Sequence, residues 1–416
     1  MNEVEVIMFQ ADCGDSFLVT IKSEKEINIL IDCGTRDTYY NCIKPKLVEM
    51  KNHNRLLDFV ILTHMHADHI EGALYLFKEN VSNDVSNIIK IENIIYNGIK
   101  GLQISNYENG TCDEYDKAVF EGVLSQGKAA LQGEGGNVSQ NISMKQELFL
   151  SSYILKGGYR WNSFSQFTDG IILADDLPKI EIDNNTSITF LSPNAENLKN
   201  LNQLWEKSLK KIRKKITLIE NDLTRNAYEA YMYLISRLES EQLIHQISQE
   251  SVINTKDVRK LSKLEIEQDT KKIENGSSIA FMLTFKDKNL LFLGDSFSEI
   301  YYKNLLRLKK EGMKTYFDLI KVSHHGSKFN ICDEFLENFD SAIYLISTNG
   351  KYDHPDIETI SKIINRKIDI SSNDQNRRSI IISNETQSIK KFDKKILKDE
   401  FNYTIRYLSN ESIIIK

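Results

Sequence analysis

The segment Thr63-His64-Met65-His66-Ala67-Asp68-His69 brings four potential metal ligands together directly after an apolar run, FVIL. Two histidines at alternate positions of an extended chain point the same way, whereas Asp68 and His69 lie on the turn beyond and can face a second point. Imidazole and carboxylate are the usual ligands of zinc and are acceptable to manganese or ferrous iron. This short peptide is therefore able to hold two metal ions.

Three later segments share this arrangement, in which an apolar run leads to a potential ligand. They supply Asp295, His324, His325 and His354. In the first of them, NLLFLGD, the glycine would let the backbone approach closely, so that the following carboxylate is able to bridge two cations. Together with the first segment they contain six of the eight histidines. The sequence thus predicts one site assembled from several loops.

Short β-branched runs bounded by Gly, Asp or Asn predict the strands that must position these residues. They are EVIMF, FLVTI, INILIDCG and DFVILTH in the first part of the chain, and SSIAFMLTF, NLLFLGDS, DLIKVSHHG, AIYLIST, RSIIIS and ESIIIK in the last. Between them, apolar residues from Trp205 to Leu223 are spaced alternately by four and three, which indicates a heptad seam. We expect one α/β domain built from residues 1–194 and 274–416, with a helical hairpin inserted at residues 195–273.

The composition narrows the class of protein. The 416 residues carry 53 Lys+Arg against 59 Asp+Glu, a net charge of −6 that excludes a basic protein coating nucleic acid. With 41% hydrophobic and 27% charged residues the chain is expected to be globular, and five cysteines without a CxxC pair argue against a disulfide framework. No apolar run approaches the roughly 18 to 20 residues of a membrane span, and the acidic start is unlike a signal peptide. We therefore expect a cytoplasmic protein that does not bind membranes.

The order of the motifs, ILIDCG, THMHADH, GD, HHGS and HP, resembles the metallo-β-lactamase superfamily. Within it the sequence is most similar to the branch that includes the C-terminal domain of the competence protein ComEC. FQADCGDS at residues 9–16 resembles the DVGQGDS segment of that branch, and NGSS at residues 275–278 stands just before the strand that leads to the GD motif. The resemblance covers residues 4–193 and 275–360, and it implies a four-layer αββα sandwich.

The resemblance also implies two divalent ions, zinc or manganese, bridged by Asp295. The expected ligands of the first ion are His64, His66 and one histidine of HHGS, and those of the second are Asp68, His69 and His354. We favour His325 as the HHGS ligand and His324 as a proton donor or phosphate contact, and the opposite assignment stays open. Asp68 and His324 are the expected catalytic residues, whereas Asp32 and Ser327 are expected to support the ligands without binding metal.

Two bridged divalent ions would lower the pKa of water to about 7, and would clamp phosphoryl oxygens or polarise a carbonyl, which indicates a hydrolase. The resemblance to ComEC favours a phosphodiesterase that degrades DNA. The alternatives are a small-molecule hydrolase acting on a phosphoester, lactone or thioester, and an interaction subunit that works through its helical insertion.

The insertion bears on partners as well. Its basic run at residues 207–215 is read as the solvated face of a helix, with contact to a nucleic-acid backbone as the alternative. The heptad seam, within residues 200–270, would be buried by the return helix, by a second copy of the chain or by another protein.

Overall fold

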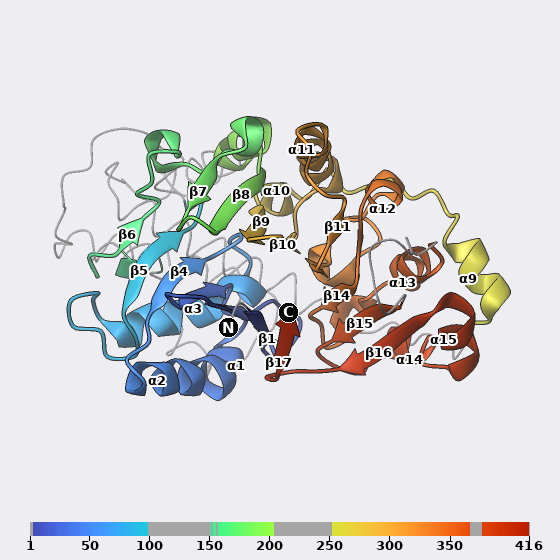
Figure 1. Ribbon diagram of the computed structural model, residues 1–416, viewed down its shortest axis with the longest axis horizontal. Helices are drawn as coiled ribbons and strands as arrows, with labels where there is room; N and C mark the ends of the chain where they lie inside the picture. The colour runs from blue at the N-terminus through green and yellow to red at the C-terminus, as the bar shows by residue number, and fades with distance from the viewer. Residues whose placement is uncertain are drawn as a thin grey trace, which may run out of the picture.

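The structure, a computed structural model, describes residues 3–98, 150, 153–154, 157–203, 252–366 and 377–415. Two β-sheets lie face to face, and helices cover the outer side of each, as Figure 1 shows. This arrangement is the αββα sandwich that the sequence predicts.

The first sheet has the strand order β17-β1-β2-β3-β4-β5-β6. Its strands are β1 (Glu3–Met8), β2 (Phe17–Lys22), β3 (Ile27–Ile31), β4 (Leu57–Ile61), β5 (Ile91–Ile95), β6 (Arg160–Trp161) and β17 (Ser412–Ile415). Strands β3 to β6 run parallel, whereas β17 pairs antiparallel with β1. The end of the chain therefore completes the sheet that its beginning starts, and the two termini lie close together in Figure 1.

The second sheet has the order β16-β15-β14-β12-β10-β9-β8-β7. Its strands are β7 (Lys179–Glu181), β8 (Thr186–Ser192), β9 (Ala280–Phe285), β10 (Lys288–Phe292), β12 (Leu319–Lys321), β14 (Ile343–Ile346), β15 (Arg378–Ile382) and β16 (Tyr403–Tyr407). The run from β10 to β16 is parallel, so the carboxyl ends of β10, β12 and β14 meet at one edge. Two short strands, β11 (Tyr316–Phe317) and β13 (Asp340–Ser341), pair with each other.

Helices from both halves of the chain form the outer layers. The first sheet is covered by α1 (Arg36–Thr38), η1 (Tyr39–Ile43), α2 (Lys44–Asn52) and α3 (Ala67–Asn80). The second is covered by α11 (Ser298–Lys310), α12 (Asp333–Asn338), α13 (Ile357–Ile364), α14 (Gln387–Lys390) and α15 (Lys395–Phe401). The described residues also contain short helical turns: η4 (Thr168–Gly170), η5 (Ala174–Asp176), α10 (Ile273–Gly276), η6 (Ser323–Gly326) and η7 (Lys351–Asp353). Within the described ranges, no helix has both the length and the apolar character needed to cross a membrane.

Alternate side chains of the strands fill three apolar layers, as a four-layer sandwich requires. On β3, Leu30 packs with the outer helices while Ile29 packs between the sheets. On β10, Leu291 packs with the outer helices and Leu290 packs between the sheets. Each fully buried side chain of this kind contributes about 1.5–3 kcal/mol. The central strands are therefore fixed from both faces, and so are the loops that leave them.

The predicted helical insertion lies largely outside the described residues. Residues 195–203 are helical, and α9 (Thr255–Leu261) begins at an Asn254 cap whose side chain accepts from the backbone N–H groups of Lys256 and Asp257. Residues 262–272 form turns and irregular backbone, so the return helix is shorter than the pattern TKDVRKLSKLEIEQ suggests. The heptad seam and the basic run lie outside the described ranges, so the hairpin and the boundaries 195–273 stay predictions.

Candidate metal centre

The HxHxDH motif lies between the end of β4 and the first turn of α3. Every residue of β4 is buried, and the chain leaves the strand just before Thr63 and His64. His66 is the residue before the helix, and Asp68 and His69 lie in its first turn. The change from extended chain to helix directs the two halves of the motif differently, because side chains alternate along a strand but follow a helical spacing in α3.

The GD motif makes a tight turn after β10. Gly294 has φ +51°, and a Cβ atom there would lie 2.5 Å from the hydroxyl oxygen of Ser278, so only glycine fits without strain. The backbone N–H of Asp295 donates to the same hydroxyl at 3.0 Å. This turn buries the Asp295 carboxylate at the end of the second sheet.

The HHGS motif makes a second tight turn, after β12. His324 and His325 both have left-handed backbone conformations, with φ 47° and 54°. Such conformations are uncommon for residues other than glycine and persist where the surroundings impose them. The backbone N–H of His324 donates to the carbonyl of Gly294 at 2.9 Å, which ties this turn to the GD turn.

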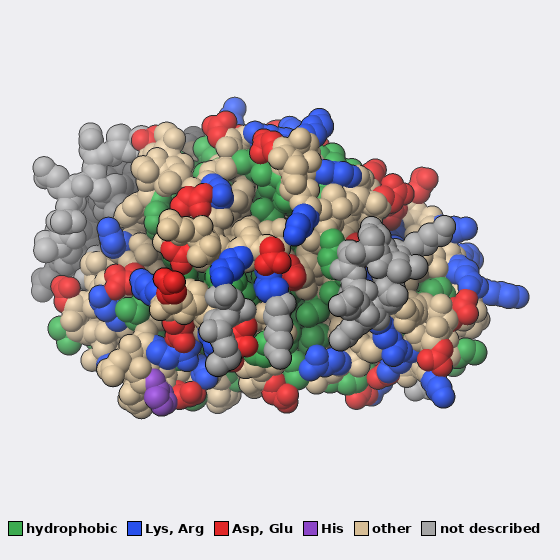
Figure 2. All heavy atoms as spheres, viewed as in Figure 1, with side chains coloured by type: hydrophobic (Ala, Val, Ile, Leu, Met, Phe, Trp, Pro, Cys, Tyr) green, Lys and Arg blue, Asp and Glu red, His purple; other side chains and the backbone are tan. Residues whose placement is uncertain are grey.

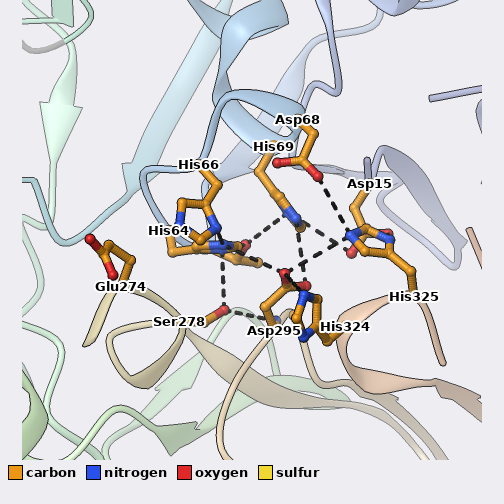
Figure 3. A network of polar contacts seen from close by, with 12 residues as sticks. Asp15, His64, His66, Asp68, His69, Glu274, Ser278, Asp295, His324 and His325 are labelled. Atoms are coloured by element: carbon orange, nitrogen blue, oxygen red, sulfur yellow. Dashed lines mark hydrogen bonds and ion pairs between the residues drawn. The ribbon is translucent and has the colours of Figure 1, made fainter. Parts of the chain in front are cut away.

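These loops converge on the Asp295 carboxylate (Figure 3). His69 Nε2 lies 3.5 Å from its Oδ1 atom. The Oδ2 atom of Asp295 lies 3.7 Å from His64 Nε2, 3.7 Å from His324 Nε2 and 3.9 Å from His325 Nε2. Asp295 is thus the common neighbour of imidazoles that come from both sheets.

Three of these rings are fixed by hydrogen bonds through Nδ1. The bonds are from His69 to Asp32 Oδ2 (2.8 Å), from His325 to the carbonyl of Ser347 (2.8 Å) and from His324 to Asn330 Oδ1 (2.9 Å). Since Nδ1 carries the donated proton, each ring presents Nε2 to Asp295. Asp32 therefore contacts the ring of His69, and its role in supporting a metal ligand stays a prediction.

The structure groups the ligands differently from the assignment made from the sequence. Within the described residues, three triads have ligand atoms within 4.8 Å of one another: His64, His69 and Asp295; Asp68, His69 and His325; and Asp15, Asp32 and His69. His325 Nε2 lies 3.7 Å from Asp68 Oδ2, so the structure places His325 beside Asp68, and its assignment to the ion of His64 and His66 stays a prediction. The left-handed turn at His325 explains this placement, because it carries the ring to the α3 side of the cluster.

The other predicted residues border these triads. His66 Nδ1 lies 3.0 Å from His64 Nε2. The His354 ring lies 5.5 Å from that of His324, and its Nδ1 atom is buried without a hydrogen-bond partner among the described residues. Ser327 is buried in the HHGS turn, where its hydroxyl accepts from the backbone N–H of Phe329. This contact stabilises the turn, and the support that Ser327 gives to a ligand stays a prediction.

Burial keeps four of the histidines neutral, His324 among them. It lowers the pKa of His64 well below its ordinary value, and the neighbouring imidazoles act in the same direction. It also lowers the pKa of His66 to about 4 and that of His354 to about 3. Neutral imidazole is the form that binds metal, so these rings need not lose a proton first.

Carboxylates reverse this effect at two other rings. Burial alone would lower the pKa of His69 and His325, but Asp295 and Asp32 outweigh it at His69, and Asp15 and Asp295 outweigh it at His325, so both pKa values are raised. Burial would raise the pKa of Asp295, yet the surrounding imidazoles hold it well below its usual range. In the metal-free protein these charges compensate one another.

The donor set fits a divalent metal. His69 Nε2, His325 Nε2 and Asp295 Oδ1 are buried and lack a hydrogen-bond partner within the described residues. Buried polar atoms are nearly always paired, so three unpaired atoms in one cluster indicate a missing partner. Imidazole nitrogen and carboxylate oxygen are the atoms that zinc and manganese prefer in proteins.

Sequence reasoning did not single out three further residues of this site: Asp15, Ser278 and Lys321. Asp15 and Ser278 stand in the two segments that resemble ComEC, but neither was assigned a role. Lys321 ends the otherwise apolar strand β12 and is buried. A lysine inside an apolar run is the sequence signal that was available for it, since lysine is almost never fully buried without a partner.

Residues 13–105 match the family model described as the metallo-beta-lactamase superfamily. No curated protein matches the sequence. Among solved structures the chain is similar to Zn(2+)-bound PqqB from Methylobacterium extorquens, with 9% identity and a TM-score of 0.36 over 99% of both chains. It is also similar to a long form RNase Z from yeast, with 10% identity and a TM-score of 0.34 over 100% of this chain and 47% of that one.

The family match covers the HxHxDH motif, and the two stacked sheets with their outer helices supply the sandwich around it. Over the matched residues 13–105 the chain is therefore similar to the metallo-β-lactamase superfamily.

Proposed function

We propose that this protein is a hydrolase that depends on two divalent ions, zinc or manganese, and that it cleaves phosphodiester bonds, with DNA as its substrate. One observation carries the proposal: buried imidazoles and carboxylates from both sheets converge on Asp295, and several of their ligand atoms lack a partner in the described structure. The proposed ligands are His64, His66, Asp68, His69, Asp295, His325 and His354.

Bound divalent ions would supply water of lowered pKa and positive charge for the oxygens of a phosphoryl group. His324 is the proposed proton carrier. Asn330 accepts its Nδ1–H, and burial lowers the pKa of its ring, so the neutral ring presents an unprotonated Nε2 to the site. That atom can take a proton and return it to the leaving oxygen. Asp68 is only partly buried, as are His66 and His354, so these are the proposed ligands that are open to substrate.

The preference for a phosphodiester rests on the two segments that resemble ComEC. Residues 9–16 contribute Asp15, which contacts His325. Residues 275–278 contribute Ser278, which accepts the backbone N–H of Asp295. Both segments therefore border the proposed metal centre, which supports carrying the substrate class over with them. On the face drawn in Figure 2, acidic and basic side chains intermingle, so support for a polyanionic substrate comes from the centre itself.

The test is cleavage of linear single-stranded and double-stranded DNA with manganese or zinc. Wild-type protein is expected to cleave one or both, and Asp295→Asn or Asp68→Ala is expected to abolish cleavage. Asp318→Asn is the matched control, because Asp318 is a half-buried carboxylate that accepts the backbone N–H of Asn289 at the opposite end of β12. Cleavage of bis(4-nitrophenyl) phosphate without any cleavage of DNA would favour a small-molecule phosphoesterase instead.

A further inference from the structure

A buried ion pair joins the two sheets behind the proposed ligands. Lys321 ends β12 in the second sheet, and Asp15 stands just before β2 in the first. The Lys321 amino group contacts the Asp15 carboxylate, and their side chains are only 1% and 2% exposed. Because the two residues come from different sheets, the pair is a cross-link between the two halves of the site.

Each partner also contacts a part of the proposed metal centre. Asp15 Oδ1 lies 3.5 Å from His325 Nδ1, and Asp15 Oδ2 lies 3.9 Å from His69 Nδ1. The Lys321 amino group donates to the carbonyl of Gly294 at 3.1 Å, directly before Asp295. The pair therefore touches two ligand rings through the carboxylate and the turn that carries a third ligand through the ammonium group.

The loop that carries Asp15 has little freedom to move. A Cβ atom on Gly14 would lie 1.7 Å from the carbonyl oxygen of Asp68, so this loop packs directly against the HxHxDH turn. The backbone N–H of Asp15 donates to that carbonyl at 3.2 Å. From the other side, the Ser347 hydroxyl donates to the carbonyl of Gly14 at 2.6 Å. Asp15 is thus held in a fixed position relative to both sheets.

Stability alone is a poor reason for such a pair. Removing two charges from water costs several kcal/mol per ion, and replacing a buried pair by apolar residues of similar size is often neutral or stabilising. Groups that hydrogen-bond to metal ligands, in contrast, change metal affinity or activity typically 10- to 100-fold when they are mutated. Lys321 hydrogen-bonds to the turn that carries Asp295, and the Asp15 carboxylate lies within ion-pair distance of His325 and His69, so the pair acts on the surroundings of the proposed ligands.

We propose that Asp15 and Lys321 are positioning residues of the metal centre: the carboxylate holds His325 and His69 in place together with Ser347 and Asp32, which accept their Nδ1–H groups, and the ammonium group holds the Gly294–Asp295 turn at a fixed distance from them. The inference rests on the proposed metal centre, and it adds a function for two residues outside the proposed set of ligands.

The test compares two double variants. Asp15→Asn with Lys321→Met removes both charges at similar volume and leaves no unpaired buried ion. The matched control is Asp340→Asn with Arg378→Met, which removes another buried ion pair (2.5 Å) at the opposite ends of β14 and β15 from Ser347. The measurements are cobalt(II) affinity by competition with a chromophoric chelator, the visible spectrum of the cobalt-loaded protein, and the melting temperature of the metal-free protein.

The site variant is expected to bind cobalt about 10- to 100-fold more weakly than wild type and to show a changed cobalt spectrum. The control variant is expected to melt at a lower temperature while keeping wild-type affinity and spectrum. Unchanged affinity and spectrum in the site variant would overturn the inference and leave the metal centre standing. Equal losses of affinity in both variants would overturn it too, because the pair would then act only through general stability.

Two further outcomes are separated by the same experiment. Wild-type protein that binds no cobalt would overturn the metal centre itself, and the inference with it. If the double variant does not fold, Asp15→Glu is used in its place, because it keeps the charge but shifts the carboxylate by one methylene. A changed cobalt spectrum in Asp15→Glu supports the positioning role, and an unchanged one overturns it.

Discussion

Replacing Asp295 by asparagine should remove most of the metal affinity. The substitution keeps the shape of the side chain but removes one negative charge that lies 3.5–3.9 Å from four imidazole nitrogens. Two unit charges about 4 Å apart attract by about 4 kcal/mol at an effective dielectric constant of 20. Desolvation offsets part of this, so we expect a loss of about 3–4 kcal/mol, or roughly two to three orders of magnitude in affinity.

The assay is a zinc titration in competition with a chromophoric chelator, with the zinc-induced rise in melting temperature as a second readout. Asp295→Asn should show weakened binding and a much smaller rise, whereas the distant control Asp318→Asn should behave as wild type does. A zinc affinity of Asp295→Asn within about threefold of the wild-type affinity would refute the reasoning. A threefold change corresponds to about 0.65 kcal/mol, which is far below the attraction expected at these distances.

Three other perturbations test the surroundings of the centre. Gly14→Ala should displace the HxHxDH turn, since the new Cβ would lie 1.7 Å from the Asp68 carbonyl, and both metal content and melting temperature should fall. Asp32→Asn removes the carboxylate that accepts His69 Nδ1–H, so zinc affinity should fall about 10- to 100-fold in the same competition titration with little change in unfolding. The pKa values of His69 and His325 are raised, so both rings hold protons in the metal-free protein that metal must displace. Metal binding should therefore release protons, and the metal affinity should increase as pH rises above about 6.5. The protonated rings also stabilise the metal-free protein, and this contribution to stability is lost as pH rises through their raised pKa values. Calorimetry in buffers of different ionisation enthalpy measures the release, and an affinity independent of pH would contradict it.

The sequence predicts an apolar strand directly before three of the motifs, and the structure has a strand at each of these places. The run before His64 is β4, the run before Asp295 is β10 and the run before His324 is β12. Local pattern is sufficient here, since strand period and turn residues are properties of neighbouring positions. The sandwich follows from the same strands, because each must bury both faces.

The grouping of the ligands could not be predicted in this way. His325 lies beside Asp68 because two consecutive residues adopt left-handed backbone conformations, and a sequence without glycine at those positions gives no sign of that. The pairing of Asp15 with Lys321 depends on how two sheets stack, which no local pattern encodes. Likewise, β17 joins the first sheet although it is the last strand of the chain.

Metal analysis of the purified protein tests the central claim most directly. The protein is purified without chelators and then dialysed against zinc or manganese. Its metal content is measured by inductively coupled plasma mass spectrometry. Two bound ions per chain, falling well below two in Asp295→Asn, is the result that the geometry around Asp295 predicts. A wild-type protein that is folded by circular dichroism, carries no metal and takes none up on dialysis would contradict the assignment of this site.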